Sequence, residues 1–228
     1  MTHLQPLYYL IYYDASRLII LQWKLVYPCR TCIINVLNKT LNTPYFRTIN
    51  TVAMLYLAIM DKLRLHGMVN YDMIKMFHAG MDTASKNDVL IAFREGRCKC
   101  VIATVAFGMG INISDVDTVI HWGCAKSELA YWQEMGRCAR DGRQGVSIMY
   151  AFPHSLVSTL TTSGMREICS SNSCIRRAML SFLRIDGMEE LPRLPICINE
   201  NDSGSVTCNE CPAQCCCSNC ASMCKCQQ

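Results

Sequence analysis

Apolar residues recur along the chain at two different spacings, and the two spacings alternate. One amphipathic helix is predicted where four apolar residues fall three or four positions apart and a glycine follows; these are Val52, Leu55, Ile59 and Leu63. The run TPYFRTI just before them is short, apolar and β-branched, which predicts a strand. A second helix is expected over TASKNDVLIAFREG, with Thr83 or Ser85 as its N-cap.

Short apolar runs separate these helical stretches. They are Met73–Phe77, a brief apolar segment, Cys100–Thr104, which resembles a buried strand, and the segments DVDTVIHWG and GVSIMYAF, which are expected to form two further strands. The segment SELAYWQEMGRCARDGR is helical until its glycines, and one more helix is expected over Ser170–Leu183. Strands that alternate with helices predict βαβ units, because parallel neighbours require crossover connections. The expected fold class is therefore α/β, a mostly parallel sheet with helices on both faces.

Length and composition agree with one main domain and a small appended module. The 228 residues are 51% hydrophobic and 18% charged, which argues against a disordered chain. The net charge of +4 suits a nucleic-acid binder but is too small to indicate one. Among the 17 cysteines, a group crowds into the tail, namely Cys208, Cys211, Cys215, Cys216, Cys217, Cys220, Cys224 and Cys226. This group follows a long αβ segment, so metal ligation is favoured over the disulfide framework of a small secreted domain.

The stretch Leu7–Tyr27 is apolar enough to raise the question of a membrane span. Charged and polar residues interrupt it, namely Asp14, Arg17, Gln22 and Lys24, whereas a spanning helix needs ~20 nearly uncharged residues. No small-residue cleavage pattern follows a short apolar region, which argues against a signal peptide. We therefore expect an intracellular protein that does not associate with a membrane.

Three sequence blocks follow one another in a specific order. They are FHAGMD at Phe77–Asp82, VIATVAFGMGINISDVDTVIHWG from Val101, and YWQEMGRCARDGR up to Arg143. Together they resemble motifs IV, V and VI of the second RecA-like lobe of RecQ helicases. The segment PCRTCIINV resembles the lead-in strand of that lobe, and YFRT resembles its first strand. This resemblance implies an ATP-dependent 3′-to-5′ DNA helicase that acts in recombination, repair and replication.

Motif VI carries the catalytic residues that the resemblance implies. Arg140 in GRCARDG is the arginine finger at the nucleotide, Arg137 is its phosphate-facing or interlobe companion, and Gln133 couples the nucleotide to DNA. Arginine suits this role because its planar, permanently charged group matches the phosphate oxygens during transfer. Taken without the other blocks, two arginines at a helix end would indicate surface salt bridges or a helix C-cap. Family members usually read GRAGRDG, so Ala139 stands at a glycine position, where its methyl group can block a close backbone approach.

Motifs IV and V imply the remaining contacts to DNA and nucleotide. The resemblance implies DNA contacts from Thr104, Gly108 and His78. It implies nucleotide contacts from Asn112 and Gly110. Glycines in a loop after a strand expose backbone N–H groups that a phosphate can approach, and an ordinary αβ loop also carries such glycines for tight turning.

The cysteine-rich tail resembles a zinc module. Cys174 in CIRRAMLSFL resembles the helix-borne first ligand of the RecQ zinc module, and CCSNC resembles its closing CxxC, which is Cys217 and Cys220. The remaining ligand is open among three cysteines, which are Cys208, Cys211 and Cys216, and we choose Cys211. Four thiolates at ~2.3 Å from Zn²⁺ form a closed structural site, which would fold a tail that lacks an apolar core. Disulfides and unligated thiols are the alternatives.

ATP and Mg²⁺ are the further cofactors that the resemblance implies, shared with a first lobe. The sequence contains neither a GxxxxGK[ST] phosphate loop nor a DExH pair, so we expect this chain alone neither to hydrolyse ATP nor to unwind DNA. The implied partners are the first lobe and single-stranded and forked DNA, and the implied location is the nucleus, with the cytoplasm as an alternative. A non-enzymatic DNA-binding or regulatory fragment is the second functional hypothesis, and a disulfide-stabilised secreted domain is the third.

The predicted organisation has three parts. Residues 1–27 receive no role from the sequence. Residues 28–157 are expected to form the helicase C-terminal RecA-like domain, and residues 158–228 the zinc-binding module with its cysteine-rich tail.

Overall fold

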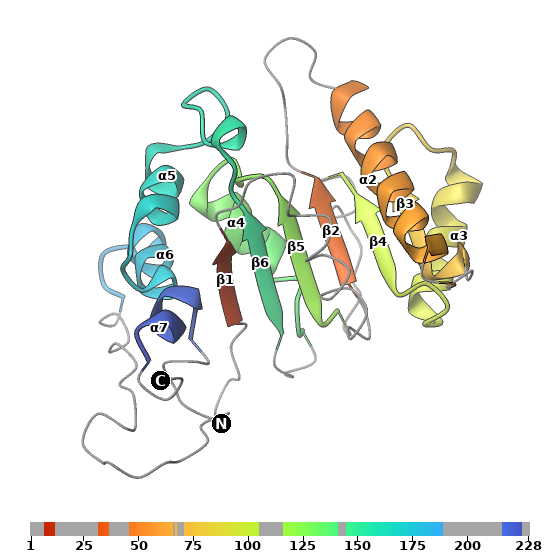
Figure 1. Ribbon diagram of the computed structural model, residues 1–228. Helices are drawn as coiled ribbons and strands as arrows, with labels where there is room; N and C mark the ends of the chain where they lie inside the picture. Colours follow the sequence, from red (N-terminus) through yellow and green to blue (C-terminus); the bar gives the residue numbers. More distant parts are fainter. Residues whose placement is uncertain are drawn as a thin grey trace.

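The structure, a computed structural model, describes residues 7–11, 32–36, 46–65, 67, 71–104, 116–140, 145–188 and 216–224. Its centre is a sheet of six strands in the order β1-β6-β5-β2-β4-β3 (Figure 1). The strands are β1 (Leu7–Ile11), β2 (Cys32–Val36), β3 (Ile74–Phe77), β4 (Cys100–Ala103), β5 (Thr118–Trp122) and β6 (Val146–Tyr150). All neighbouring strands run parallel, which confirms the α/β fold predicted from the alternating pattern.

Both faces of the central strands are buried, because successive side chains point to opposite sides of a sheet. The face under α2 (Phe46–Leu65) contains a row of isoleucines, which are Ile34, Ile102, Ile120 and Ile148. The opposite face packs against α3 (Thr83–Arg94) through Ile33, Val101 and Val119. The helices that connect the strands therefore cover both faces of the sheet (Figure 1).

Helix α2 begins earlier than the sequence pattern indicates. Because Phe46–Leu65 is one helix, the strand predicted in TPYFRTI and in YFRT (Tyr45–Thr48) is wrong from Phe46 onward. A short apolar run fits a strand and a buried helix equally well, and a helix that has nucleated gains one hydrogen bond for each further residue. The apolar positions predicted for this helix do face the core, since Val52, Leu55 and Ile59 are buried.

A short 3₁₀ turn, η1 (Tyr71–Met73), leads into β3, and α3 follows with a cap that differs from the predicted one. The N-cap of α3 is Asp82, rather than Thr83 or Ser85. The Asp82 carboxylate accepts hydrogen bonds from the Ser85 backbone N–H at 2.9 Å and the Ser85 hydroxyl at 2.6 Å. These bonds satisfy an N–H group of the first helical turn that otherwise lacks a partner.

Beyond β5, the described residues form the helices α4 (Glu128–Met135), α5 (Ser163–Ser170), α6 (Ile175–Leu183) and α7 (Ser218–Ser222). A 3₁₀ turn, η3 (Pro153–Ser155), follows β6. Helices α5, α6 and α7 gather beside β1 at one end of the sheet (Figure 1).

The single helix predicted over Ser170–Leu183 is wrong in its first part, because Ser170 ends α5 and a new helix begins after Cys174. At Gly164, helix α5 lies close to both neighbouring helices, because a Cβ there would meet the Glu128 carboxylate of α4 and lie 2.7 Å from the Phe182 ring of α6.

Strand β1 comes from the segment 1–27, to which the sequence assigned no role. Its residues Leu7–Ile11 pair with β6 in parallel register, from Leu7 opposite Val146 to Ile11 opposite Tyr150. The backbone of β1 also lies next to α6 and α7. This strand therefore forms the sheet edge on the side of the cysteine-rich helices.

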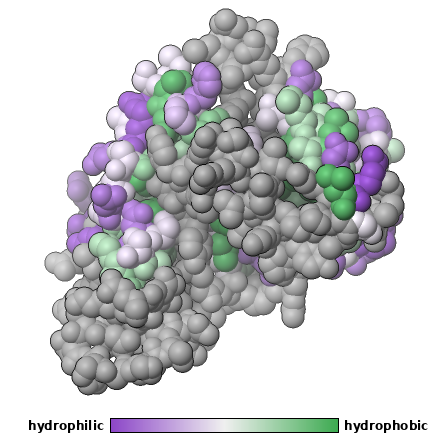
Figure 2. All heavy atoms as spheres, viewed as in Figure 1, coloured by the Kyte–Doolittle hydropathy of each residue, from purple (hydrophilic) through white to green (hydrophobic). Residues whose placement is uncertain are grey.

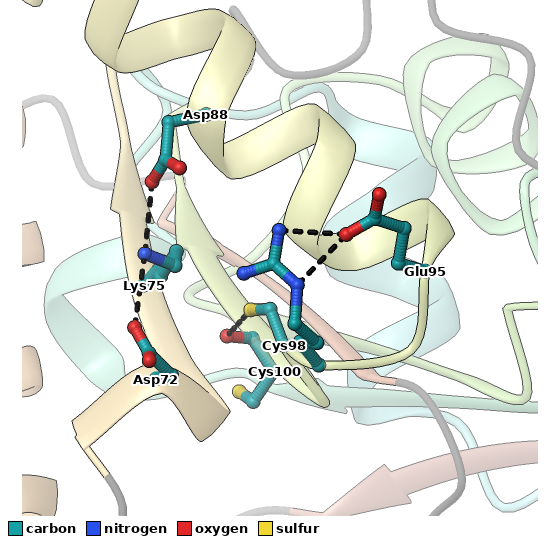
Figure 3. A network of polar contacts seen from close by, with 7 residues as sticks. Asp72, Lys75, Asp88, Glu95, Cys98 and Cys100 are labelled. Atoms are coloured by element: carbon teal, nitrogen blue, oxygen red, sulfur yellow. Dashed lines mark hydrogen bonds and ion pairs between the residues drawn. The ribbon is translucent and has the colours of Figure 1, made fainter.

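At the other edge of the sheet, β3 is tied to its neighbours by charged side chains (Figure 3). Lys75 on β3 donates a hydrogen bond to Asp88 on α3 at 2.9 Å and forms an ion pair with Asp72 at 3.4 Å. The bond to Asp88 is the main cause that raises the pKa of Lys75. Below this network, the buried Cys98 thiol donates to the Cys100 carbonyl at 3.2 Å, and burial raises the pKa of Cys98 to about 12.

Hydrophobic residues also remain on the outside of α2. They gather along this helix at the upper right of Figure 2, where Met54 is 70% exposed and Leu57 is 60% exposed. Among the described residues, no helix has both the length and the apolar character needed to cross a membrane.

The central core predicts a large cost for shortening a buried strand residue. We expect Ile102→Ala to lower the free energy of unfolding by about 2–5 kcal/mol, because it leaves a cavity under α2. Urea unfolding followed by circular dichroism measures this change. The matched control is Ile91→Ala on the exposed side of α3, which should stay within about 0.5 kcal/mol. Equal effects of the two substitutions would contradict the assigned core.

Candidate functional site

Helix α4 carries the first part of the motif VI block. Ser127 caps its N-terminus by accepting a hydrogen bond from the Ala130 N–H at 3.2 Å. Tyr131 and Met135 point into the core, and the Tyr131 hydroxyl lies 3.1 Å from the Ser147 hydroxyl on β6. Gln133, which the sequence places in the site, lies on the last turn of this helix and is exposed. Its neighbours on the helix thus fix its position while its own side chain remains accessible.

The turn after α4 is anchored to the amino end of β5. The Ala139 N–H donates to the Val116 carbonyl at 2.8 Å, and the buried Cys138 thiol donates to the Asp117 carbonyl at 2.9 Å. Cys138 also lies 3.5 Å from the Val146 carbonyl at the start of β6. The cysteine that replaces the usual alanine therefore helps to hold the turn against two strands.

Ala139 has a left-handed backbone conformation, with φ at +54°. A side chain with a Cβ is strained there, which explains why a glycine is usual at this position. The Ala139 methyl group has room only because residue 145 is a glycine. A Cβ on Gly145 would lie 2.8 Å from the Ala139 Cβ and would also collide with the Cys138 thiol. Gly145 leaves the space that the turn needs, so the alanine is accommodated at the expense of backbone strain.

The two arginines of the block differ in their surroundings. Arg140 is exposed, and its Nε donates to the Gly136 carbonyl at 3.1 Å, which is the helix C-cap contact considered from the sequence. Arg137 is half-buried, and burial together with the nearby Arg140 charge lowers the pKa of its guanidinium, with Glu134 acting in the opposite direction. The two guanidinium groups thus lie near each other, and each destabilises the charge of its neighbour.

A buried polar pair beneath this helix was missed by the sequence analysis. His121 on β5 is fully buried, and its Nε2 lies 3.1 Å from a carboxylate oxygen of Glu134 on α4, without the angles of a hydrogen bond. The His121 ring also meets Tyr131 edge to face, with ring centroids 5.0 Å apart. A histidine within the apolar strand TVIHW is the signal that could have found this pair.

His78 and Thr104 lie at the carboxyl ends of adjacent strands. The Thr104 N–H donates to the Phe77 carbonyl at 3.2 Å, which brings the residues after β3 and β4 together. Burial, and secondarily the Lys86 charge, lower the pKa of His78, so its ring is neutral at pH 7. His78 can therefore offer a hydrogen bond to a phosphate but not a positive charge. Gly108, Gly110 and Asn112 lie outside the described residues.

The sheet separates these two groups of predicted site residues. In a parallel sheet the carboxyl ends of all strands lie on the same side. His78 and Thr104 follow the carboxyl ends of β3 and β4 on that side, which we call the carboxyl edge. Helix α4 runs back across the sheet, so Arg137 and Arg140 lie at the amino edge, next to Val116. The arginines and the two predicted DNA contacts thus belong to two different edges of the same sheet.

Four buried cysteines come together from distant parts of the sequence. The sulfur atoms of Cys174, Cys216, Cys217 and Cys220 all lie within 4.8 Å of one another. Three of the four ligands predicted from the sequence are among them. Cys211, the fourth choice, lies outside the described residues, and Cys216, one of the alternatives, occupies the cluster.

The geometry and chemistry of this cluster fit a tetrahedral metal ion. Sulfurs at ~2.3 Å from Zn²⁺ would lie about 3.8 Å apart, and the Cys174 and Cys216 sulfurs lie 3.6 Å apart. Hydrogen bonds from Cys174 and Cys216 hold the pKa of the Cys217 thiol far below its ordinary value, while the pKa of Cys216 is raised. The Asn219 side-chain amide donates to the Ser171 and Ser173 carbonyls at 2.9 and 2.8 Å, and these bonds hold α7 against the segment just before Cys174.

The strain at Ala139 predicts a stabilising substitution. We expect Ala139→Gly to raise the free energy of unfolding by up to about 1 kcal/mol, because relief of the left-handed strain outweighs the added freedom of the unfolded chain. Thermal and urea unfolding measure this effect. The control is Ala58→Gly within α2, which should destabilise the protein by about 1 kcal/mol. Destabilisation by both substitutions would mean that residue 139 is not left-handed.

Comparison with known proteins finds a matching family model and similar helicases. Residues 31–142 match the family model described as the helicase conserved C-terminal domain. The chain is 49% identical over 161 residues to the mouse bifunctional 3′-5′ exonuclease/ATP-dependent helicase WRN, an alignment that covers 57% of this chain and 12% of that protein. It is 29% identical over 140 residues to the ATP-dependent DNA helicase RecQ of Pasteurella multocida, which covers 54% of this chain and 22% of that protein. The chain thus spans only a small part of these relatives.

Solved structures share the fold at lower sequence identity. The C-terminal domain of the DEAD-box protein Dbp5 superimposes with a TM-score of 0.53 at 21% identity, covering 86% of this chain and 92% of that one. The Mycobacterium smegmatis helicase Lhr, bound to single-stranded DNA and AMP-PNP, gives a TM-score of 0.55 at 15% identity, covering 72% of this chain and 21% of that one. The order of the three motif blocks, the six-stranded parallel sheet, the family match and the relatives lead to one conclusion: this chain contains a helicase conserved C-terminal domain, the second RecA-like lobe of a helicase motor, and is similar in sequence to RecQ-family helicases.

Proposed function

We propose that this chain is the second motor lobe of an ATP-dependent 3′-to-5′ DNA helicase that acts in recombination, repair and replication. The observation that carries the proposal is the exposed Arg140 on a turn that is fixed to β5 and lies beside the half-buried Arg137. A rigidly held cation on an accessible edge is what a nucleotide bound between two lobes requires from the partner side.

In this proposal Arg140 is the catalytic arginine finger. Its guanidinium would approach the γ-phosphate and offset the negative charge that develops during phosphoryl transfer. Arg137 would hold a second phosphate oxygen or the opposite lobe, and the lowered pKa of Arg137 agrees with a cation that gains by meeting an anion. Gln133, exposed one turn earlier on α4, would link the nucleotide to DNA. Asn112 and Gly110 would contribute at the nucleotide.

The proposed path of the DNA backbone is the carboxyl edge of the sheet. Thr104, Gly108 and His78 would contact phosphates there, with His78 as a neutral hydrogen-bond donor. Single-stranded and forked DNA are the proposed substrates. Because this edge is opposite to the arginine turn, movement of the lobe on the nucleotide would be transmitted to DNA through the sheet and α4.

We further propose that Cys174, Cys216, Cys217 and Cys220 hold a structural Zn²⁺. When bound, the ion would supply a fixed tetrahedral link between the start of α6 and the tail helix α7. All four sulfurs are buried, which leaves no open position for a substrate. The site would therefore stabilise the module rather than take part in the reaction.

ATP hydrolysis in this proposal requires Mg²⁺ and a phosphate loop that a first lobe supplies, since the 228 residues contain no GxxxxGK[ST] sequence. The chain alone would bind DNA in a salt-dependent way without turning over ATP. The proposed location is the nucleus, where such a helicase meets its DNA.

The proposed finger predicts the effect of one substitution. When the chain is joined to the first lobe of a RecQ-family relative, single-stranded DNA should stimulate ATP hydrolysis. Arg140→Ala in this two-lobed protein should lower kcat by about 10³–10⁵-fold, and Arg140→Lys should restore little, because lysine lacks the planar fork. A coupled ATPase assay measures both.

The matched control for this experiment is Arg94→Ala, which removes an exposed arginine at the end of α3. It should leave kcat within about twofold. Strong ATP hydrolysis by the unjoined chain, or by the Arg140→Ala protein, would refute the proposed division of roles between the lobes. DNA binding without any ATPase activity in the joined protein would favour a non-enzymatic DNA-binding function instead.

The zinc proposal predicts how many zinc ions each chain binds and that removal of one ligand abolishes this binding. Protein purified under reducing conditions should contain one zinc ion per chain by metal analysis, and Cys220→Ser should abolish that binding and lower the thermal stability. Cys98→Ser is the control, because Cys98 is not one of the four clustered cysteines and its thiol donates to the Cys100 carbonyl at the start of β4. Full zinc content in the Cys220→Ser protein would contradict the ligand set.

A further inference from the structure

A second pair of facing thiols lies outside the four-cysteine cluster. Cys124 follows β5 just after Gly123, and Cys169 lies on the last turn of α5. Their sulfurs are 3.8 Å apart, both residues are buried, and both belong to the core between α4, α5 and α6. A disulfide requires sulfurs about 2.05 Å apart, so the two thiols are reduced neighbours that a small rotation of each side chain would bring into bonding distance.

The hydrogen bonds around this pair give the two sulfurs different roles. The single proton of the Thr161 hydroxyl is donated to the Ala125 carbonyl at 2.6 Å. Thr161 can then only accept from Cys124, whose sulfur lies 3.5 Å away, and Cys169 in turn donates to Cys124. Cys124 is thus the sulfur that receives a hydrogen bond from the other thiol.

Two charges of opposite sign act on Cys124: the Glu128 carboxylate raises the pKa of its thiol, and the Arg166 guanidinium lowers it. Arg166 is fixed by a hydrogen bond of 2.6 Å from its Nη1 to the Thr161 carbonyl, which keeps a positive charge close to Cys124. The hydrogen bond from Cys169 lowers the pKa of Cys124, burial opposes this shift, and the same contact raises the pKa of Cys169. A thiolate forms most readily on the sulfur that accepts a hydrogen bond, which makes the contact from Cys169 the feature that singles out Cys124.

We propose that Cys124 and Cys169 form a redox-active pair that a peroxide converts to a disulfide linking the strand end of the motor lobe to α5. The Cys124 thiolate attacks one peroxide oxygen, the O–O bond breaks, and with one proton taken up the products are a sulfenic acid and water. The Cys169 sulfur then attacks the Cys124 sulfur, and the hydroxyl group leaves with the Cys169 proton as a second water. Two thiols are oxidised and one peroxide is reduced to two waters.

The other buried thiols of the described core are held differently. Cys98 and Cys138 direct their thiols at backbone carbonyls, and the pKa of about 12 keeps Cys98 protonated. The Cys98 thiol is therefore a weak nucleophile. Because Cys124 and Cys169 are themselves 5% and 7% exposed, a small oxidant reaches them through local opening of the packing.

The link would join two regions that the proposed function treats as separate parts. Cys124 lies just before α4, which leads to the arginine turn, and Cys169 lies five positions before Cys174, the first thiol of the metal cluster. The disulfide would close a loop between residues 45 positions apart and so limit the freedom of the unfolded chain. This inference goes beyond the motor function and holds whether or not the chain hydrolyses ATP with a partner.

The test uses the full chain, reduced and zinc-loaded, treated with hydrogen peroxide and then blocked with an alkylating agent. Trypsin should yield a linked pair of peptides, residues 100–126 with residues 167–176, and fragmentation should assign the link to Cys124 and Cys169 rather than Cys100 or Cys174. The midpoint of thermal unfolding should rise by about 5–10 °C on oxidation, and a reductant should reverse the rise. The zinc content should not change.

Two variants and one control make the result specific. Cys124→Ser and Cys169→Ser should each lose the oxidative rise of the midpoint, whereas Cys98→Ser should retain it, because its serine can donate to the Cys100 carbonyl as the thiol does. The peptide map of the unchanged protein does not depend on how well any variant folds. Absence of the 124–169 link in that map, a link that involves Cys174 instead, or a rise that persists in Cys124→Ser would overturn the proposal.

Discussion

Burial of both faces of the parallel sheet is the constraint on which the other features of this protein depend. Isoleucine and valine side chains of β2, β4 and β5 are buried on both faces of the sheet, so helices must cover both sides, and each connection must run back across the sheet. The carboxyl ends of the strands therefore lie on one side of the sheet, and the carboxyl ends of the connecting helices lie on the other. This geometry puts His78 and Thr104 at the carboxyl ends of the strands and the arginine turn at their amino ends.

The arginine turn shows how a departure from a family pattern can be absorbed. Ala139 keeps the left-handed conformation that a glycine would adopt without strain, and its N–H still bonds the Val116 carbonyl. Cys138 compensates in part, since its thiol bonds the Asp117 carbonyl beneath the turn. The backbone path is therefore preserved, and the position of Arg140 depends on these bonds to β5 rather than on the residue type at position 139.

The cysteines have at least three different structural roles in this chain, although in the sequence they stand out only by their large number. Cys98 and Cys138 fill core positions and donate to carbonyls, and the four thiols of Cys174, Cys216, Cys217 and Cys220 form a cluster that fits a metal ion. Cys124 and Cys169 face each other outside that cluster. Spacing in the sequence identified the closing CxxC pair, but contact between residues 45 positions apart has no local signature.

The sequence by itself determined the α/β fold, the order of the motif blocks, the core positions of α2 and three of the four clustered cysteines, because each depends on local periodicity or spacing. Tertiary structure decided the start of α2 at Phe46, the N-cap at Asp82 and the split between α5 and α6, since packing overrides a short ambiguous run. It also decided that Leu7–Ile11 closes the sheet beside β6, that Cys216 joins the cluster and that His121 meets Glu134. These are long-range contacts, and their partners are chosen by the folded chain and not by neighbours in sequence.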